Sequence, residues 1–227
     1  MADQSGATLA KTFENQQVDH RRASDHLVRG IDFLFALTLG QGILLFQDFW
    51  LDPLHADNLP VALALFAVYF ATFQSFIDWH LAMEQRPFLV TWELRFWERI
   101  PERIRVFVDL SIVMTYAYLL VNATPLITDP GYDMSPFLIG FPIVFGLYTA
   151  WSILRRIRYE GASLGRLWVV LSFAGVFLLI YLGYALISPP DWFLPSDRDQ
   201  NIFTLGLVIL TVFLYRVTNM IVGRRPS

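Results

Sequence analysis

The chain has 227 residues, of which 55% are hydrophobic and 16% are charged, and its formal net charge is −3. A soluble domain averages about 25% charged residues, and here the charges cluster between long apolar runs, which indicates a bilayer-embedded chain. The chain has no cysteine, which excludes disulfides, thiolate catalysis and cysteine-based metal sites.

The two ends of the chain are polar and differ from the apolar middle. Residues 1–28 are mixed in charge and contain no apolar run of the signal-peptide type, so they are predicted to form a cytoplasmic tail. Residues 29–223 are predicted to form a transmembrane domain, and residues 224–227 a short C-terminal tail. We therefore expect one membrane domain between two polar tails.

Six apolar stretches are long enough, or nearly so, to cross the hydrocarbon core of about 30 Å as helices. They are Ile31–Gln47, Pro60–Ile77, Val106–Ala123, Met134–Leu154, Leu167–Ile187 and Ile202–Val222. The stretches are continuous and do not alternate, which excludes a β-barrel. The first three are short and are expected to extend into their flanks, and Pro142 predicts a kink in the fourth.

Basic residues are concentrated in every second segment that flanks or connects the apolar stretches. Arginine-rich segments precede the first stretch, separate the second from the third and the fourth from the fifth, and follow the sixth. Of the 17 Lys and Arg residues, only Arg198 falls in the other set of loops, which are rich in Asp, Pro and Gly. The positive-inside rule then predicts six spans with both termini in the cytoplasm. The expected fold is an all-α integral membrane protein built from three helical hairpins.

The segment Phe88–Ile104, between the second and third stretches, is amphipathic. Its aromatic residues include Trp92 and Phe96, while Arg95, Arg99 and Arg103 recur along another face at helical spacing. This pattern predicts an interfacial helix that ends or kinks at Pro101. A linker helix packed on the cytoplasmic helix ends is the alternative.

No motif of a catalytic or metal-binding protein is present in the sequence. HExxH, GxSxG, Walker and GxGxxG motifs are all absent, and no two of the four histidines lie three or four residues apart. We therefore expect no enzymatic activity, no cofactor, no metal site and no nucleic-acid partner.

Several charged residues lie within the ends of the apolar stretches, all on the predicted cytoplasmic side. We call this set the charge belt; its members are Arg29, Asp32, Asp78, His80, Arg105, Asp109 and Arg216. Charges within spans are costly and usually face the bundle interior or water. The belt is read either as a set of salt bridges that fix packing, for instance Arg29–Asp32 and Arg105–Asp109, or as a polar vestibule that leads to a pore.

The first stretch is the best pore-lining candidate by sequence. The residues predicted to line a pore are Phe35, Thr38, Leu39, Gln41 and Phe46. Large apolar side chains in such a pore can close it by excluding water. The alternative is ordinary helix packing, in which Ala36 and Gly40 allow a close helix contact.

The run from Arg29 to Leu39, which reads R-G-I-D-F-L-F-A-L-T-L, resembles the first helix of the lysosomal and bacterial potassium channel family that lacks a re-entrant filter loop. Asp32, Phe35, Ala36 and Leu37 match the D-x-x-F-A-[IL] part of its motif, and Trp79-His80 is similar to the end of its second helix. Gly30-Ile31 replaces the Phe-Ser of the motif, which puts that family's helix-packing network in doubt. The resemblance implies a tetramer with the first helix lining a cation pore.

The sequence therefore favours a channel-like, oligomeric protein that conducts small cations in a bacterial inner membrane. The rival class is a non-conducting sensor or anchor that recruits a cytoplasmic partner through the basic segment and the N-terminal tail. A small transporter is the third alternative.

Overall fold

The computed structural model describes residue 26 and residues 28–51, 58–85, 96–158, 164–187 and 194–223. Within these ranges the regular structure is entirely helical. A helix over Val28–Leu45 is followed by α2 (Gln47–Leu51), α3 (Leu59–Gln85) and α4 (Phe96–Ala123). The 3-10 helix η2 (Thr124–Ile127), α5 (Ser135–Leu138), α6 (Gly140–Arg158), α7 (Leu164–Leu186) and α8 (Asp197–Gly223) complete it.

Six helical segments are long and apolar enough to cross a membrane, which confirms the predicted number of spans. They are Val28–Leu45, Leu59–Met83, Arg103–Ile127, Ser135–Arg156, Leu164–Leu186 and Asp197–Val222. The second and third extend beyond their apolar stretches, as expected, because a helix continues through polar flanks once its backbone hydrogen bonds are started. The protein is therefore a multi-pass membrane protein by the length and composition of its helices.

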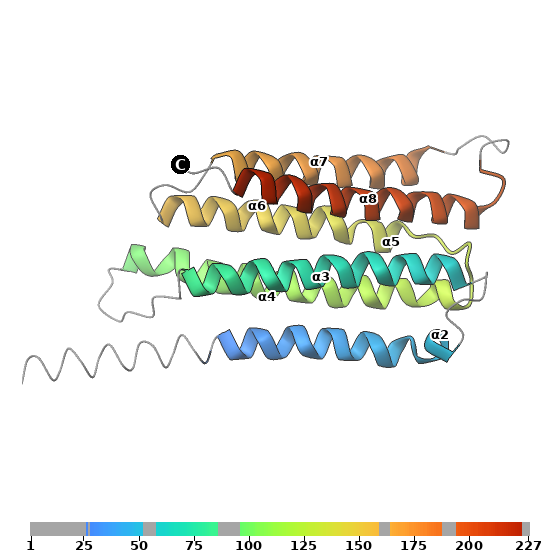
Figure 1. The fold of residues 1–227 in the computed structure, drawn as a ribbon, viewed down its shortest axis with the longest axis horizontal. Helices are drawn as coiled ribbons and strands as arrows, with labels where there is room; N and C mark the ends of the chain where they lie inside the picture. The colour runs from blue at the N-terminus through green and yellow to red at the C-terminus, as the bar shows by residue number, and fades with distance from the viewer. Residues whose placement is uncertain are drawn as a thin grey trace, which may run out of the picture.

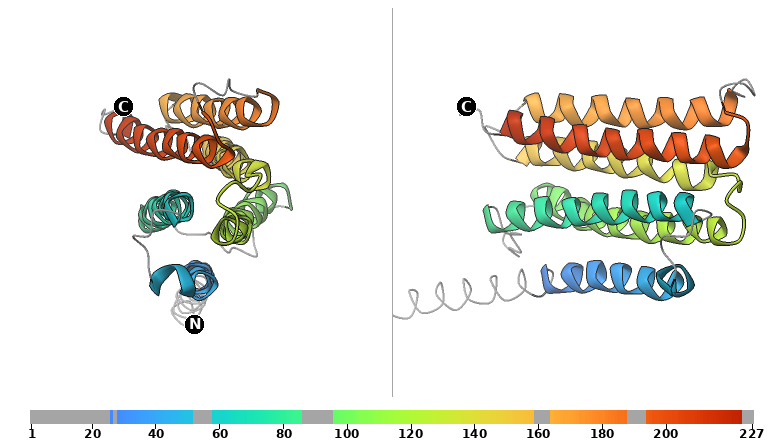
Figure 2. Two further views of the ribbon diagram at one scale, coloured as in Figure 1. Left: turned by 90° about the vertical axis from the view of Figure 1, so that its right-hand side faces the viewer. Right: turned by 45° about the vertical axis from the view of Figure 1, so that its right-hand side comes forward.

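The long helices lie roughly parallel to one axis, and each runs in the opposite direction to the one before it (Figure 1). The first helix, Val28–Leu45, and α7 lie at opposite edges of the bundle, and α3, α4, α6 and α8 lie between them (Figure 2). The beginning of the first helix and the end of α8 lie at the same end of the bundle, on the left in Figure 1. We call this the inner end.

The helix does not end at Pro101, which was one of the two outcomes predicted from the sequence; a kink at this residue stays a prediction. Residues from Phe96 onward belong to α4, which continues through Pro101 to Ala123. The proline removes a single backbone hydrogen bond, a loss that the remaining turns of a 28-residue helix outweigh. The earlier part of the predicted interfacial helix, residues 88–95, lies outside the described residues.

The fourth span is interrupted where the sequence predicts a kink. Helix α5 ends at Leu138 and α6 begins at Gly140. Pro142 has no N–H to donate to the carbonyl of Leu138, four residues earlier, which explains the break at this point.

The core of the bundle is built from close helix contacts and stacked aromatic rings. The ring centroids of Phe145 and Phe177 lie 4.5 Å apart, and those of Phe141 and Phe177 lie 5.4 Å apart. Gly140 allows α6 to approach α4, because a Cβ at this position would lie 2.5 Å from Leu119 Cδ2. These contacts join α4, α6 and α7 into one packed unit.

The first helix is attached to α3 by apolar packing and by one hydrogen bond. Phe35 packs edge-on against Phe76, with ring centroids 5.5 Å apart. The Tyr69 hydroxyl donates to the carbonyl oxygen of Leu39 over 3.3 Å. A side chain at Gly42 would collide with that hydroxyl and press on Leu120, whereas Gly40 has no neighbouring atom within 4 Å of an added Cβ.

The contrast between these two glycines gives a direct test of the helix contact. We expect Gly42→Ala to lower the free energy of unfolding by about 1–3 kcal/mol, because the new methyl group displaces the Tyr69 hydroxyl. Gly40→Ala should be neutral or stabilising by up to about 1 kcal/mol, because alanine is the better helix former. Thermal and denaturant unfolding of both variants in the same detergent measures the difference. Equal effects of the two substitutions would contradict the proposed contact.

Candidate functional site

An ion pair joins α3 and α8 near the inner end of the bundle. Arg216 Nη1 donates to Asp78 Oδ1 over 2.5 Å. Both side chains are partly shielded and lie about two helical turns from the ends of their helices. A charge at this depth is stable only with a partner or water, so the pair fixes α8 against α3.

A second pair links the first helix to α3. His80 Nδ1 lies 4.0 Å from Asp32 Oδ1, and the two groups attract each other when His80 is protonated. The sequence suggested that Asp32 would pair with Arg29 within the same helix, but its described partner is on another helix, and Arg29 is exposed. The belt therefore includes contacts between helices that are far apart in sequence.

Arg105 and Asp109 bring the belt into the space between α3, α4 and α6. Arg105 is 8% exposed and Asp109 is 2% exposed, so both are true interior residues. Arg105 Nη2 lies 3.5 Å from Met83 Sδ of α3, and its guanidinium carbon lies 5.8 Å from the ring centroid of Trp151 in α6. Arg105 thus contacts both neighbouring helices.

A layer of hydroxyl groups lies deeper in the bundle than the belt. The Tyr116 hydroxyl donates to the carbonyl oxygen of Ala71 over 3.2 Å and lies 2.6 Å from the Tyr148 hydroxyl. Tyr116 has a single hydroxyl hydrogen, so Tyr148 is the donor in the second bond. Ser75 lies beside both hydroxyls, and Tyr116 and Tyr215 are within electrostatic range of Asp78.

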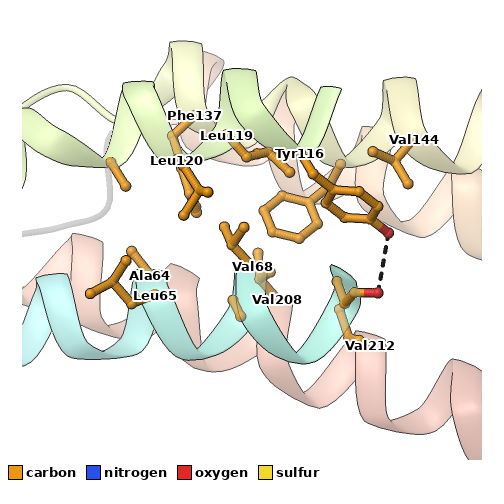
Figure 3. Close-up of a cluster of buried hydrophobic side chains, with 14 of the residues drawn as sticks. Ala64, Leu65, Val68, Tyr116, Leu119, Leu120, Phe137, Val144, Val208 and Val212 are labelled. Carbon is orange, nitrogen blue, oxygen red and sulfur yellow. Dashed lines mark hydrogen bonds between the residues drawn. The ribbon is translucent and has the colours of Figure 1, made fainter. Parts of the chain in front are cut away.

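An apolar layer follows the hydroxyl layer toward the other end of the bundle. Its side chains come from α3, α4, α5, α6 and α8 and fill the space between these helices (Figure 3). The members labelled in Figure 3 are Ala64, Leu65, Val68, Leu119, Leu120, Phe137, Val144, Val208 and Val212. Figure 3 also shows the hydrogen bond from Tyr116 that borders this layer. These apolar side chains border the polar inner half of the core on the side that faces away from the inner end.

A polar contact at the opposite end fixes the loop between α4 and α5. Asn201 in α8 is 0% exposed, and its amide donates to the carbonyl oxygens of Pro130 over 2.9 Å and of Tyr132 over 3.0 Å. The Tyr184 hydroxyl donates to Asn201 Oδ1 over 2.9 Å and accepts a hydrogen bond from the Met134 N–H. Sequence reasoning missed Asn201; its signal was an amide side chain, next to Gln200, at the start of an apolar span.

The beginning of α8 is held by a reciprocal cap. The Asp199 N–H donates to Ser196 Oγ over 3.2 Å, and the Ser196 hydroxyl donates to Asp199 Oδ2 over 2.6 Å. Such a cap satisfies orphan groups of the first turn. Together with Asn201, this cap holds the beginning of α8 in place, at the end of the bundle opposite to the inner end, which we call the outer end.

The structure separates the predicted pore-lining residues of the first helix. Phe35, Thr38 and Phe46 are buried against the bundle, Leu39 is half-buried, and Gln41 is exposed. Phe35 also lies near Trp79, with ring centroids 6.4 Å apart, and so adjoins the inner end of α3. Their role in lining a pore stays a prediction.

The predicted interfacial residues are described only in part. Trp92 and Arg95 lie outside the described residues, and Phe96 and Arg99 belong to the first turns of α4, where side-chain placement is not described. Arg103 is exposed at the beginning of the third span. Among the described residues, no three His, Asp or Glu side chains gather in a way that could hold a metal ion.

No family model matches the chain, and comparison with curated proteins and with solved structures gives no match. The resemblance of the first helix to a potassium channel family therefore stays a prediction. The proposed function therefore depends on the charge belt, the hydroxyl layer and the apolar layer of the bundle.

The ion pair between Asp78 and Arg216 makes a measurable prediction. We expect Asp78→Asn and Arg216→Gln each to lower the free energy of unfolding by about 1–3 kcal/mol, because each leaves one charge without its partner. The double variant should cost less than the sum of the two single variants. Unfolding of all four proteins in one detergent gives the coupling energy, and strictly additive effects would rule out a direct interaction.

Proposed function

We propose that the six spans insert as three helical hairpins, with both termini and the inner end of the bundle in the cytoplasm of a bacterial cell. The support is the distribution of basic residues, since the arginine-rich segments all adjoin the inner end. The segment between η2 and α5, at the opposite end of the bundle, contains Asp129 and Asp133 and no Lys or Arg. This asymmetry supports the proposed orientation of the bundle in the membrane.

The absence of native cysteine makes this orientation easy to test. A single cysteine at Thr128, an exposed position at the outer end, should react with a membrane-impermeant maleimide added to intact cells or spheroplasts. A single cysteine at Arg156, exposed at the inner end of α6, should react only after the membrane is permeabilised. Labelling of both positions from the same side would contradict six spans, and the reverse pattern would invert the orientation.

We propose that the protein passes small cations across the membrane through the interior of this bundle, as a channel-like oligomer. The observation that carries this proposal is the order of layers along the core. Charged side chains lie near the inner end, hydroxyl groups lie deeper, and apolar side chains close the core beyond them. Ionisable and hydroxyl groups at membrane depth usually mark an ion pathway.

The apolar layer acts as the gate in this proposal, because a ring of valine and leucine side chains excludes water and therefore ions. Asp78 supplies the negative charge that draws a cation toward the gate, and Arg216 neutralises it while the bundle is closed. The closed bundle opens when α8 moves away from α3 at its inner end. The outer end of α8 stays in place, because Asn201 and the Ser196 cap hold it.

The first helix forms one edge of the bundle and is the candidate contact between copies. Its face around Gly40 is not covered by any of the residues that the structure describes, and Ala36 and Gly40 together allow a close helix contact. The tetramer implied by the family resemblance is one such assembly. The proposed pathway runs inside each protomer, so the contact between copies does not line the gate.

The gate is tested by comparing two valines in liposome flux assays with potassium and sodium gradients. Val208→Ser places a hydroxyl in the apolar layer and should raise cation flux about tenfold, equivalent to lowering the barrier by about 1.4 kcal/mol. Val121→Ser is the matched control, because Val121 is 58% exposed on the outside of the bundle and should leave flux unchanged. Asp78→Asn should change flux in the Val208→Ser background, because it removes both the charge that draws the cation and the ion pair that holds α8 against α3.

Several outcomes would contradict the proposed pathway. Equal flux for the two serine variants would place the gate elsewhere, and insensitivity to Asp78→Asn would remove that carboxylate from the pathway. Complete absence of flux in every variant, at all potentials and pH values, would favour the alternative of a non-conducting sensor or anchor, which predicts that result.

A further inference from the structure

Gln74 on α3 carries a polar atom for which the described part of the bundle provides no partner. Its side-chain oxygen, Oε1, is fully covered, and none of the described residues donates a hydrogen bond to it. Along α3, Gln74 lies between Val68 of the apolar layer and Asp78 of the ion pair. A buried acceptor without a donor is costly, and a leucine would fill the same place without that cost. The presence of this oxygen therefore requires an explanation other than packing.

Gln74 lies one helical turn farther from the inner end than Asp78. Residues four apart on a helix lie on the same face, so the amide follows the carboxylate along the side of α3 that Arg216 of α8 contacts. Ser75, three residues before Asp78, lies beside the paired tyrosine hydroxyls of the hydroxyl layer. A carboxylate, an amide and a hydroxyl are thus brought together on two successive turns of α3.

The cation that contacts this carboxylate in the structure belongs to the protein itself. Arg216 donates to Asp78 Oδ1, and its guanidinium neutralises the carboxylate as a small metal cation would. The pair is not sealed from its surroundings, because the Asp78 side chain is 37% exposed and that of Arg216 is 19% exposed. A cation that enters from the inner end can therefore compete with the guanidinium for Asp78.

We propose that Asp78 and Gln74 form a binding site for a monovalent metal cation, with Ser75 as a third oxygen ligand. Arg216 takes the place of that cation on Asp78 while the bundle is closed. Oxygen ligands of this kind replace the hydration shell of an ion, and a bound cation gives Gln74 Oε1 a positive partner. The inference rests on the proposed passage of cations, and it names the side chain that receives the ion between Asp78 and the apolar layer.

The charge of the site favours a monovalent ion over a divalent one. Asp78 supplies one negative charge, and Gln74 and Ser75 are neutral, so a monovalent cation leaves the three ligands and the ion without net charge. A divalent cation would leave a positive charge in an interior of low dielectric constant, which is costly. It would also repel the guanidinium of Arg216 on α8. We therefore expect sodium and potassium to bind more tightly than magnesium and calcium.

Binding is measured with the full-length purified protein in detergent, without any flux assay. Arg216→Gln removes the internal cation, so sodium or potassium chloride should raise the Tm of this variant more than N-methyl-D-glucamine chloride, whose cation is too large for the site. Adding Gln74→Leu should weaken the apparent affinity for sodium or potassium about tenfold, the effect of one lost contact to a charge. Gln47→Leu is the matched control and should leave the affinity unchanged, because Gln47 is exposed in α2.

Gln74→Leu by itself separates ion binding from packing. With Arg216 in place, this variant should keep or raise the Tm, because it removes a buried acceptor that has no donor among the described residues. A large fall in Tm would show that the amide supports the fold, and would contradict its assignment as an ion ligand.

A flux measurement tests the same site if Arg216→Gln does not fold. In the Val208→Ser background, which keeps Arg216, Gln74→Leu should lower potassium and sodium flux toward the level of the unchanged protein. Gln47→Leu should leave the flux of that background unchanged.

The outcomes distinguish failure of the site from failure of the proposed passage. Equal rises in Tm with all three chlorides, or equal effects of the two leucine substitutions, overturn the site. Tighter binding of magnesium or calcium overturns the preference for a monovalent ion. Binding that depends on Gln74, without flux in any variant, supports the site and removes the passage. Flux through Val208→Ser that neither leucine substitution changes supports the passage and overturns the site.

Discussion

The structure depends on one constraint, which is that a polar group inside a hydrocarbon layer must find its partner within the protein. This constraint explains why polar side chains inside the bundle join segments that are distant in sequence. Asn201 satisfies two loop carbonyls and one hydroxyl, and Tyr116 joins α3 to α6 through its single hydroxyl. Because these groups have no water as an alternative, each contact holds two or three helices in a fixed relation.

Under the same constraint, the two ends of α8 are held by different kinds of interaction. The outer end of α8 is held by the hydrogen bonds of the buried Asn201 amide and by an exposed helix cap at Ser196 and Asp199. The inner end of α8 is held by the partly exposed ion pair of Asp78 and Arg216. A competing ion or proton can disrupt a charged pair more readily than a saturated amide network. Movement of α8 is therefore expected at its inner end.

The sequence by itself determined the number of spans, the break in the fourth span and the gathering of charges toward one end. These features depend on local hydropathy and on single prolines such as Pro142, and a continuous apolar run leaves a membrane chain no choice but a helix. Only the tertiary structure decided which charges meet. Sequence spacing suggested Arg29 for Asp32, yet His80 is its described partner, and Asp78 and Arg216 meet across 138 residues. The partner of a side chain is set by which helix faces pack together, and neither Asn201 nor the buried side of the first helix can be read from spacing along one helix.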